Sequence, residues 1–261
     1  MLSEQERAEV ARMLAVAERE RTPVRPLIEH FPAMDVVDAY EVQLRNIRER
    51  LARGATVVGH KVGLSSEAMQ QMMGVDEPDY GHLLSDMQVL GDRTVEADRY
   101  CYPRVEVEVG FVLGEALPAE DCTEADVIAA TEYVAPAIEL IDSRIVDWRI
   151  GIVDTIADNA SSAGFVLGQE RVRPSEIDLR GIDARLRRNG EQVAEGRSDA
   201  VLGNPVTAVA WLARKVATFG VRLEAGHVIL PGSVHRAIDV RPGDEFVAEF
   251  DGLGSVSLNF V

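Results

Sequence analysis

The segment YPRVEVEVGFVLG, residues 102–114, constrains the fold most, because its side chains alternate between apolar and polar. This period of two is typical of a strand with one apolar and one polar face. The polar face carries Glu106 and Glu108, which would lie about 6.5–7 Å apart on one side of the strand. Two neighbouring carboxylates repel each other unless water or a cation lies between them. The segment is therefore either a solvated strand face or part of a divalent metal site.

The composition of the 261-residue chain narrows the classes of function. Its 46% hydrophobic content is sufficient for a core. The net charge is −17, which argues against nucleic acid or an anionic membrane as a partner. Cys101 and Cys122 have no metal-binding spacing, and no apolar run reaches the roughly 18 residues of a membrane helix. We expect a soluble, cytoplasmic protein that acts on a small molecule.

Helical patterns dominate the beginning of the chain. Residues 2–21 and 35–54 have apolar side chains at three- and four-residue steps, which predicts two amphipathic helices. The proline-containing residues 22–32 between them predict an extended connector. Residues 55–64 predict a strand and residues 65–74 a short capped helix. The next segment, VDEPDYGHL, is typical of a loop.

Strand patterns dominate the remainder. Predicted strands cover residues 104–113, 134–142, 164–168, 182–196, 227–232 and 244–261. Asn189-Gly190 and Asp251-Gly252 are hairpin signals within two of them. Helices are predicted at residues 123–134 and 205–220. The chain is therefore predicted to be an α+β protein with a large curved or rolled sheet and a helical N-terminal region.

Two charged residues interrupt predicted strands. In VVGHKVG the strand period puts Lys61 on one face with Gly59 and Gly63, where a ligand can approach. Lys61 there holds a carboxylate or acts as an acid or base; alternatively it is a surface lysine beside glycines that permit close packing. Glu139 interrupts an otherwise apolar strand, and a buried carboxylate requires a partner.

Glu106, Glu108 and Glu139 together supply three carboxylates from two strands that can be neighbours. Hard oxygen ligands of this kind suit Mg²⁺ or Mn²⁺ and leave positions for water and substrate. No histidine or cysteine is near them in the sequence, so zinc is less suitable.

Two further segments carry groups that can bind substrate. DTIADNASSAGFVLG is dense in short polar side chains, which either bind substrate oxygens or cap and turn the backbone. Gly232 and Ser233 follow a predicted strand, where N–H groups and a hydroxyl can receive a carboxylate. A simple turn explains this second segment equally well.

Five segments together resemble the 2-hydroxypenta-2,4-dienoate (2-oxopent-4-enoate) hydratases of the fumarylacetoacetate hydrolase superfamily. They are GHKVGLSSEAMQQMMGVDEPDYGHL, PRVEVEVGFVLG, IELIDSRIVDWRI, DTIADNASSAGFVLG and LGNPVTAVAWLA. The resemblance runs from Ala39 to the C-terminus and is nearest to actinobacterial members from aromatic and sterol ring degradation. It implies a mixed β-roll core, with a helical region at residues 1–55 packed on a catalytic domain at residues 56–261.

The resemblance also implies the site and its cofactor. It suggests that a magnesium or manganese ion is bound by three carboxylates, with a lysine, an aspartate and a serine close to the substrate. These residues are Glu106, Glu108, Glu139, Lys61, Asp79 and Ser161. Lys61 would neutralise the substrate or move protons, and Asp79 would activate the water. The family further implies a homo-oligomer, a pentamer or decamer, with possible contacts to neighbouring pathway enzymes.

Three functions remain open at this level. The hydratase would convert 2-hydroxypenta-2,4-dienoate to 4-hydroxy-2-oxopentanoate, and DSRIVDWRI and NPVTAVAWLA favour it. The sister 2-oxo-3-hexenedioate (4-oxalocrotonate) decarboxylase needs the same metal chelate. A catalytically silent structural partner of a pathway enzyme is the third, and the intact lysine and glutamates argue against it.

Overall fold

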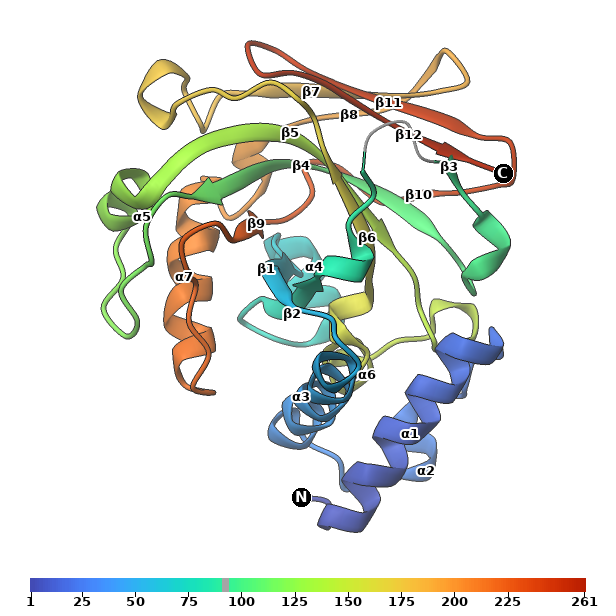
Figure 1. The fold of residues 1–261 in the computed structure, drawn as a ribbon. Helices are drawn as coiled ribbons and strands as arrows, with labels where there is room; N and C mark the ends of the chain where they lie inside the picture. Colours follow the sequence, from blue (N-terminus) through green and yellow to red (C-terminus); the bar gives the residue numbers. More distant parts are fainter. Residues whose placement is uncertain (91–93) are drawn as a thin grey trace.

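Two β-sheets pack against each other in the computed structural model, which describes residues 1–90 and 94–261 (Figure 1). In the first sheet the strand order is β2-β1-β9-β4-β5-β6, and β10 pairs with β4. Its strands are β1 (Val57–Gly63), β2 (Asp79–Leu84), β4 (Arg104–Leu113), β5 (Thr131–Ile141), β6 (Ser162–Leu167), β9 (Val228–Leu230) and β10 (Ile238–Asp239). In the second sheet the order is β3-β12-β11-β7-β8. Its strands are β3 (Thr94–Val95), β7 (Asp183–Arg188), β8 (Glu191–Arg197), β11 (Glu245–Phe250) and β12 (Gly254–Phe260).

The second sheet covers one side of the first, with β11 and β12 against β5 and β6. Phe246 and Phe260 meet edge to face in this interface, with ring centroids 5.9 Å apart. Both rings are buried in the main core, as is Val107 on the apolar face of β4. The predicted mixture of helices with a rolled sheet is therefore confirmed, and the roll consists of two sheets.

Three helices lie at the end of the molecule away from the second sheet (Figure 1). They are α1 (Glu4–Glu20), α2 (Leu27–His30) and α3 (Val36–Ala52). Ser3 and Asp35 cap the first and third through reciprocal side-chain and backbone bonds, as the sequence predicted for Asp35. Leu14 of α1 and Tyr40 of α3 belong to the same core as the strands. The division into regions 1–55 and 56–261 stays a prediction.

The remaining helices connect the strands. They are α4 (Glu67–Met73), α5 (Glu124–Ala130), α6 (Ile152–Ala157) and α7 (Pro205–Ala217). Short 3-10 helices include η3 (Val146–Trp148) and η4 (Asn159–Ser161). None of the helices in the described ranges is long and apolar enough to cross a membrane.

Three local predictions need correction. The connector contains α2, which begins directly after Pro26, where a proline interrupts no helical hydrogen bond. The segment predicted as a loop contains β2, because pairing with β1 along its whole length satisfies its backbone. The helix predicted at residues 123–134 ends at Ala130, where β-branched and aromatic residues continue into β5. In addition, the polar segment that starts at Asp154 begins within α6, a helix that was not predicted from the sequence.

Candidate active site

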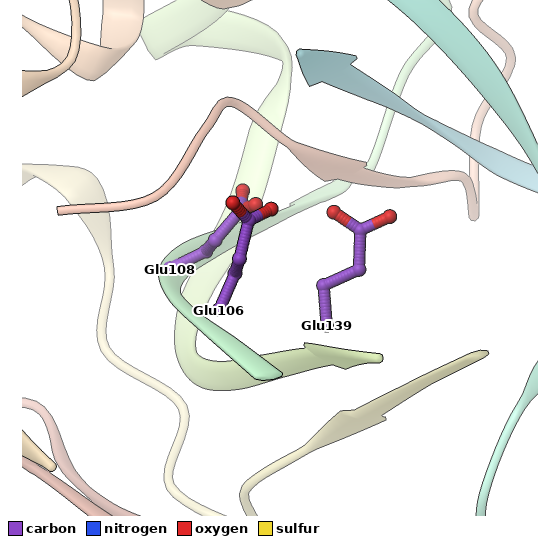
Figure 2. A group of neighbouring side chains, drawn as sticks. All are labelled: Glu106, Glu108 and Glu139. Carbon is purple, nitrogen blue, oxygen red and sulfur yellow. The ribbon is translucent and has the colours of Figure 1, made fainter. Parts of the chain in front are cut away.

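Three glutamates from two adjacent strands form the centre of the site (Figure 2). The antiparallel register of β4 and β5 places Glu106 directly opposite Glu139, and Glu108 follows on the same face of β4. One carboxylate oxygen of each residue lies within 4.8 Å of the others. Glu108 and Glu139 have no exposed surface. The alternative of a solvated strand face is therefore wrong here.

The hydrogen bonds of this cluster leave two buried oxygens free. Glu108 Oε2 accepts a bond from Gly232 N at 2.7 Å, and Glu139 Oε1 accepts one from Ser162 Oγ at 2.8 Å. Glu108 Oε1 and Glu139 Oε2 have no hydrogen-bond donor among the described residues, although Lys61 Nζ lies 3.4 Å from the latter. Buried anions need compensation, and a hard divalent cation fits three oxygen ligands of this kind.

Burial makes these carboxylates hard to ionise without such a cation. It raises the pKa of Glu106 to about 7, although the charge of Lys61 acts in the opposite direction. Burial also raises the pKa of Glu108 and Glu139, and neighbouring carboxylates raise the pKa of Glu108 further. A metal ligand must be deprotonated, so a cation and protons compete for this cluster.

The competition predicts how metal binding depends on pH. We expect Mg²⁺ affinity to fall as the pH is lowered through about 7, the pKa of Glu106, by about tenfold per pH unit for each proton displaced. Calorimetric titration with Mg²⁺ at about pH 8 and about pH 6 measures this. Equal affinities at both pH values would show that the ion does not bind these carboxylates.

Lys61 of β1 lies against the cluster rather than on the surface. Its side chain is 3% exposed, so the surface-lysine alternative is wrong. Nζ donates to Ala160 O at 2.9 Å and lies 3.4 Å from Glu139 Oε2. Burial acts to lower the pKa of Lys61, but the surrounding carboxylates outweigh it and raise the pKa above the usual range. The neighbouring glutamates therefore favour the charged form of the lysine.

Asp79, the first residue of β2, pairs with Gly63, which follows Lys61 by two residues on β1. A Cβ at Gly63 would lie 2.2 Å from Asp79 Oδ1 and 3.5 Å from Lys61 Nζ, so only glycine leaves room for the carboxylate. Asp79 Oδ2 accepts a bond from Thr155 Oγ1 at 3.0 Å, while the buried Oδ1 has no hydrogen-bond partner among the described residues. Burial raises the pKa of Asp79, and Lys61 and the Thr155 bond act against this.

A turn with unusual backbone geometry supplies the next wall of the site. Asn159, Ala160 and Ser161 all have positive φ, between 50° and 57°. Such conformations cost free energy in residues other than glycine and persist where surrounding contacts fix them. Here Arg144 binds both the carboxylate and the backbone carbonyl of Asp158, immediately before the turn. The turn presents Ala160 O to Lys61 and a buried Ser161 hydroxyl without a hydrogen-bond partner in the described part of the chain.

Gly232 and Ser233 use their polar groups within the protein. The Gly232 N–H donates to Glu108, and the Ser233 hydroxyl lies 3.3 Å from Val107 N and 3.4 Å from Val107 O. These contacts hold the segment after β9 against β4. A direct role for either residue in binding substrate stays a prediction.

A cavity of about 500 Å³ opens beside these groups. Its polar wall contains Lys61, Asp79, Glu106, Thr155 and Ser161. Four of these five residues were predicted to be in the site, and the structure brings them together from four separate segments. Glu108 and Glu139 complete the carboxylate cluster next to Glu106.

Sequence reasoning missed two residues that hold the site together. Ser162 donates to Glu139 and Thr155 donates to Asp79. Both lie in DTIADNASS, where short polar side chains indicate a substrate-binding segment but the family resemblance implies a role only for Ser161. Recognition of α6 would have distinguished Thr155, which the helix turns toward β2.

Comparison with known proteins is consistent with this geometry. Residues 57–261 match the family model described as Fumarylacetoacetate (FAA) hydrolase C-terminal. A 2-keto-4-pentenoate hydratase of Paraburkholderia xenovorans (strain LB400) is 44% identical over 259 residues, which cover 99% of this chain and 96% of the relative. A 2-oxo-hept-4-ene-1,7-dioate hydratase of Escherichia coli is 43% identical over 258 residues, covering 97% of each chain.

A solved structure extends the comparison to three dimensions. The 4-oxalocrotonate decarboxylase from Pseudomonas putida G7, complexed with magnesium and adipate, superposes with a TM-score of 0.96. It is 37% identical, and the match covers 100% of this chain and 99% of that one. That protein therefore shares the whole fold described above, including the N-terminal helices.

Proposed function

Since this chain belongs to the fumarylacetoacetate hydrolase family, we propose that its carboxylate cluster serves a metal-dependent hydratase reaction. The chain is an enzyme, a hydro-lyase like its 2-keto-4-pentenoate hydratase relatives. The reaction adds water to 2-hydroxypenta-2,4-dienoate, the enol of 2-oxopent-4-enoate, and gives 4-hydroxy-2-oxopentanoate. The observation that carries this proposal is the convergence of three buried glutamates, Lys61 and Asp79 on one cavity.

The cation would be held by Glu106, Glu108 and Glu139, and it is Mg²⁺ or Mn²⁺ because all three ligands are hard oxygens. When bound, it would act as a Lewis acid on the oxygens of the 2-oxo acid. The free oxygens of Glu108 and Glu139 support this assignment.

The chain's own residues carry the proton transfers. The enol hydroxyl must lose a proton and C5 must gain one, which gives the conjugated 2-oxo-3-enoate. The water oxygen then bonds to C4, and a proton is added at C3. Lys61, whose Nζ is held by Ala160 O, either neutralises the substrate carboxylate or moves one of these protons. Asp79 has one oxygen anchored by Thr155 and the other free, which suits it to take a proton from water.

The bond from Thr155 to Asp79 predicts a shift in the pH profile. Thr155→Val keeps the shape but removes a contact that lowers the pKa of Asp79, so the acidic limb of kcat should move to higher pH. A net hydrogen bond worth about 1 kcal/mol corresponds to a shift of about one pH unit. Thr155→Ser should restore the parent profile. A limb that does not move in Thr155→Val would exclude Asp79 as the group that activates water.

The two other functions are less well supported. Named relatives at 43–44% identity are hydratases, which favours hydration over decarboxylation despite the shared fold of the decarboxylase. A silent structural partner would have no need to keep a lysine and three carboxylates buried together.

Product analysis tests the reaction directly. Purified protein with Mg²⁺ is incubated with 2-hydroxypenta-2,4-dienoate and separately with 2-oxo-3-hexenedioate, and the products are identified by mass. We expect a gain of one water with the first acid and no loss of CO₂ from the second. Loss of CO₂ without hydration would replace the hydratase by the decarboxylase.

We also propose a cytoplasmic homo-oligomer, a pentamer or decamer, in the catabolism of aromatic or sterol rings. The resemblance to the hydratases supports this proposal, including contacts with neighbouring pathway enzymes. Light scattering of the purified protein measures the mass of the assembly, and a monomer would contradict the oligomer.

A further inference from the structure

A further cavity, of about 480 Å³, shares no lining residue with the active-site cavity. It lies between the end of α1, the end of α3, the 3-10 helix η2 (Ala97–Arg99) and the segment after β5. Its wall gathers five of the chain's 27 lysine and arginine residues, in a protein whose net charge is −17. These residues are Arg19, Arg21, Arg50, Arg99 and Arg144. Positive charge is therefore concentrated here against the charge of the whole chain.

Three carboxylates also line the cavity, and each already has partners in the protein. Both oxygens of Asp142 accept hydrogen bonds from backbone N–H groups, at 3.0 and 2.6 Å. Arg50 lies 2.7 Å from an oxygen of Asp86 and 4.0 Å from one of Glu18. The five arginines thus leave a surplus of two positive charges over the carboxylates.

Two arginines at the opening carry most of this surplus. Arg21 and Arg99 are exposed, and neither forms an ion pair with a carboxylate of the described residues. Arg21 Nη1 donates instead to the backbone oxygen of Asp98, at 3.0 Å, which ties the end of α1 to η2. Their charges are available to an anion that enters the cavity.

Arg144 supplies a buried donor in the same wall. The residue is only 5% exposed, and its guanidinium has five N–H donors in a fixed plane. Nε and Nη2 donate to the carboxylate and the carbonyl of Asp158, while no hydrogen bond from Nη1 is found within residues 1–90 and 94–261. A buried guanidinium with unused donors is suited to carboxylate or phosphate oxygens.

We infer that this cavity is a second ligand site, which binds a small dianion of the phosphate or dicarboxylate class. Arg21 and Arg99 attract the dianion at the opening, and Arg144 Nη1 donates to it inside. The site goes beyond the proposed hydratase function, because none of these three residues lines the catalytic cavity.

The site is linked to the catalytic cavity through Arg144. A smaller cavity of about 40 Å³ continues inward from Arg144 to Asp158 and Asn159. The strained turn at residues 159–161 follows directly, and its positive φ values persist only while surrounding contacts fix them. A dianion on Arg144 competes with Asp158 for one guanidinium charge, so its binding loosens the turn that presents Ala160 O to Lys61. By linkage, occupancy of one site then changes affinity at the other.

Calorimetry tests the site. The full chain with saturating Mg²⁺ is titrated with inorganic phosphate and separately with succinate, which distinguishes the two sources of a dianion. We expect saturable binding of at least one of them, with an affinity at least about tenfold lower in Arg21→Gln/Arg99→Gln, since charge-assisted hydrogen bonds are lost. Arg12→Gln/Arg48→Gln is the matched control. It removes the same charge from exposed positions on α1 and α3 outside the cavity and should bind like the parent.

Kinetics test the linkage. Values of kcat/KM for 2-hydroxypenta-2,4-dienoate are measured at constant free Mg²⁺, with and without the dianion that binds. We expect the dianion to lower kcat/KM severalfold in the parent and not in Arg21→Gln/Arg99→Gln, whose activity without the dianion should equal that of the parent. An equal fall in both proteins would show inhibition at the catalytic cavity and would overturn the linkage.

The other failures are also distinguishable. If neither anion binds saturably, or if the double variant binds them as tightly as the parent, the second site is refuted. Binding that leaves kcat/KM unchanged overturns the linkage to the turn. Absence of turnover in every protein would overturn the proposed hydratase function, while the calorimetric test of the site stands.

Discussion

Glu108→Gln should lower turnover by a factor on the order of 10² or more and abolish tight Mg²⁺ binding. Mutation of residues that only orient metal ligands typically lowers metal affinity or activity by about 10–100-fold. Glu108 is proposed as a ligand itself, so its loss should have at least this effect. The substitution removes a formal anion but keeps nearly the same shape, and the amide oxygen can still accept the Gly232 N–H. Glu106→Gln should behave in the same way, because its carboxylate belongs to the same cluster. Calorimetry and steady-state kinetics measure the two effects.

Stability measurements separate loss of the metal from loss of the fold. Without metal, Glu108→Gln should be at least as stable as the parent near neutral pH, since it removes a carboxylate whose ionisation burial opposes. Saturating Mg²⁺ should stabilise the parent, by about 2.7 kcal/mol at 100 times Kd, but not the variant. Glu132→Gln is a matched control, because Glu132 is exposed on β5, the strand of Glu139. Parent-like Mg²⁺ affinity in both Glu106→Gln and Glu108→Gln would refute the metal assignment.

The part of the site that lies on strands with a clear apolar and polar pattern was predictable from the sequence. The period of two in residues 104–113 defined β4 and put Glu106 and Glu108 on one face. The isolated acidic residue in the next apolar strand identified Glu139, and the register of β4 with β5 then placed it opposite Glu106. Local periodicity fixes which face a side chain occupies.

The remaining contacts depend on distant segments. Gly232 is 124 residues from Glu108 and Thr155 is 76 residues from Asp79, yet each forms a hydrogen bond with its partner. No local pattern encodes such pairs, so Gly232 was predicted as a donor to substrate rather than to Glu108. The segment that contains β2 looked like a loop for the same reason, because its pairing partner β1 determines its conformation.

The glycines around Lys61 illustrate the same limit. The sequence predicted that Gly59 and Gly63 leave space for a ligand. At Gly59 an added Cβ would lie 1.9 Å from Val228 O, so the backbone of the neighbouring strand β9 occupies this space. At Gly63 the carboxylate of Asp79 occupies the corresponding space. Glycine was correctly associated with close approach, but only the fold determines what approaches.

Lys61→Met should lower kcat/KM by a factor on the order of 10² or more at saturating Mg²⁺. Methionine retains an unbranched stem of similar length, but the positive charge and the bond to Ala160 O are lost. Losses of this size are typical of a positioned group that transfers a proton or stabilises developing charge. Lys215→Met is the matched control, since Lys215 is the only other lysine and pairs with Glu77.

Separate measurement of kcat and KM in Lys61→Met identifies the role of Lys61. If its charge binds the substrate carboxylate equally in the ground and transition states, KM rises while kcat stays near the parent value. If Lys61 moves a proton, kcat and kcat/KM fall together. Circular dichroism at the assay temperature tests whether the variant is folded. This control is needed because the substitution removes the ammonium group beside the buried Glu139 carboxylate. Values of kcat and kcat/KM within about threefold of the parent would exclude Lys61 from both roles, since a group in either role contributes more than this.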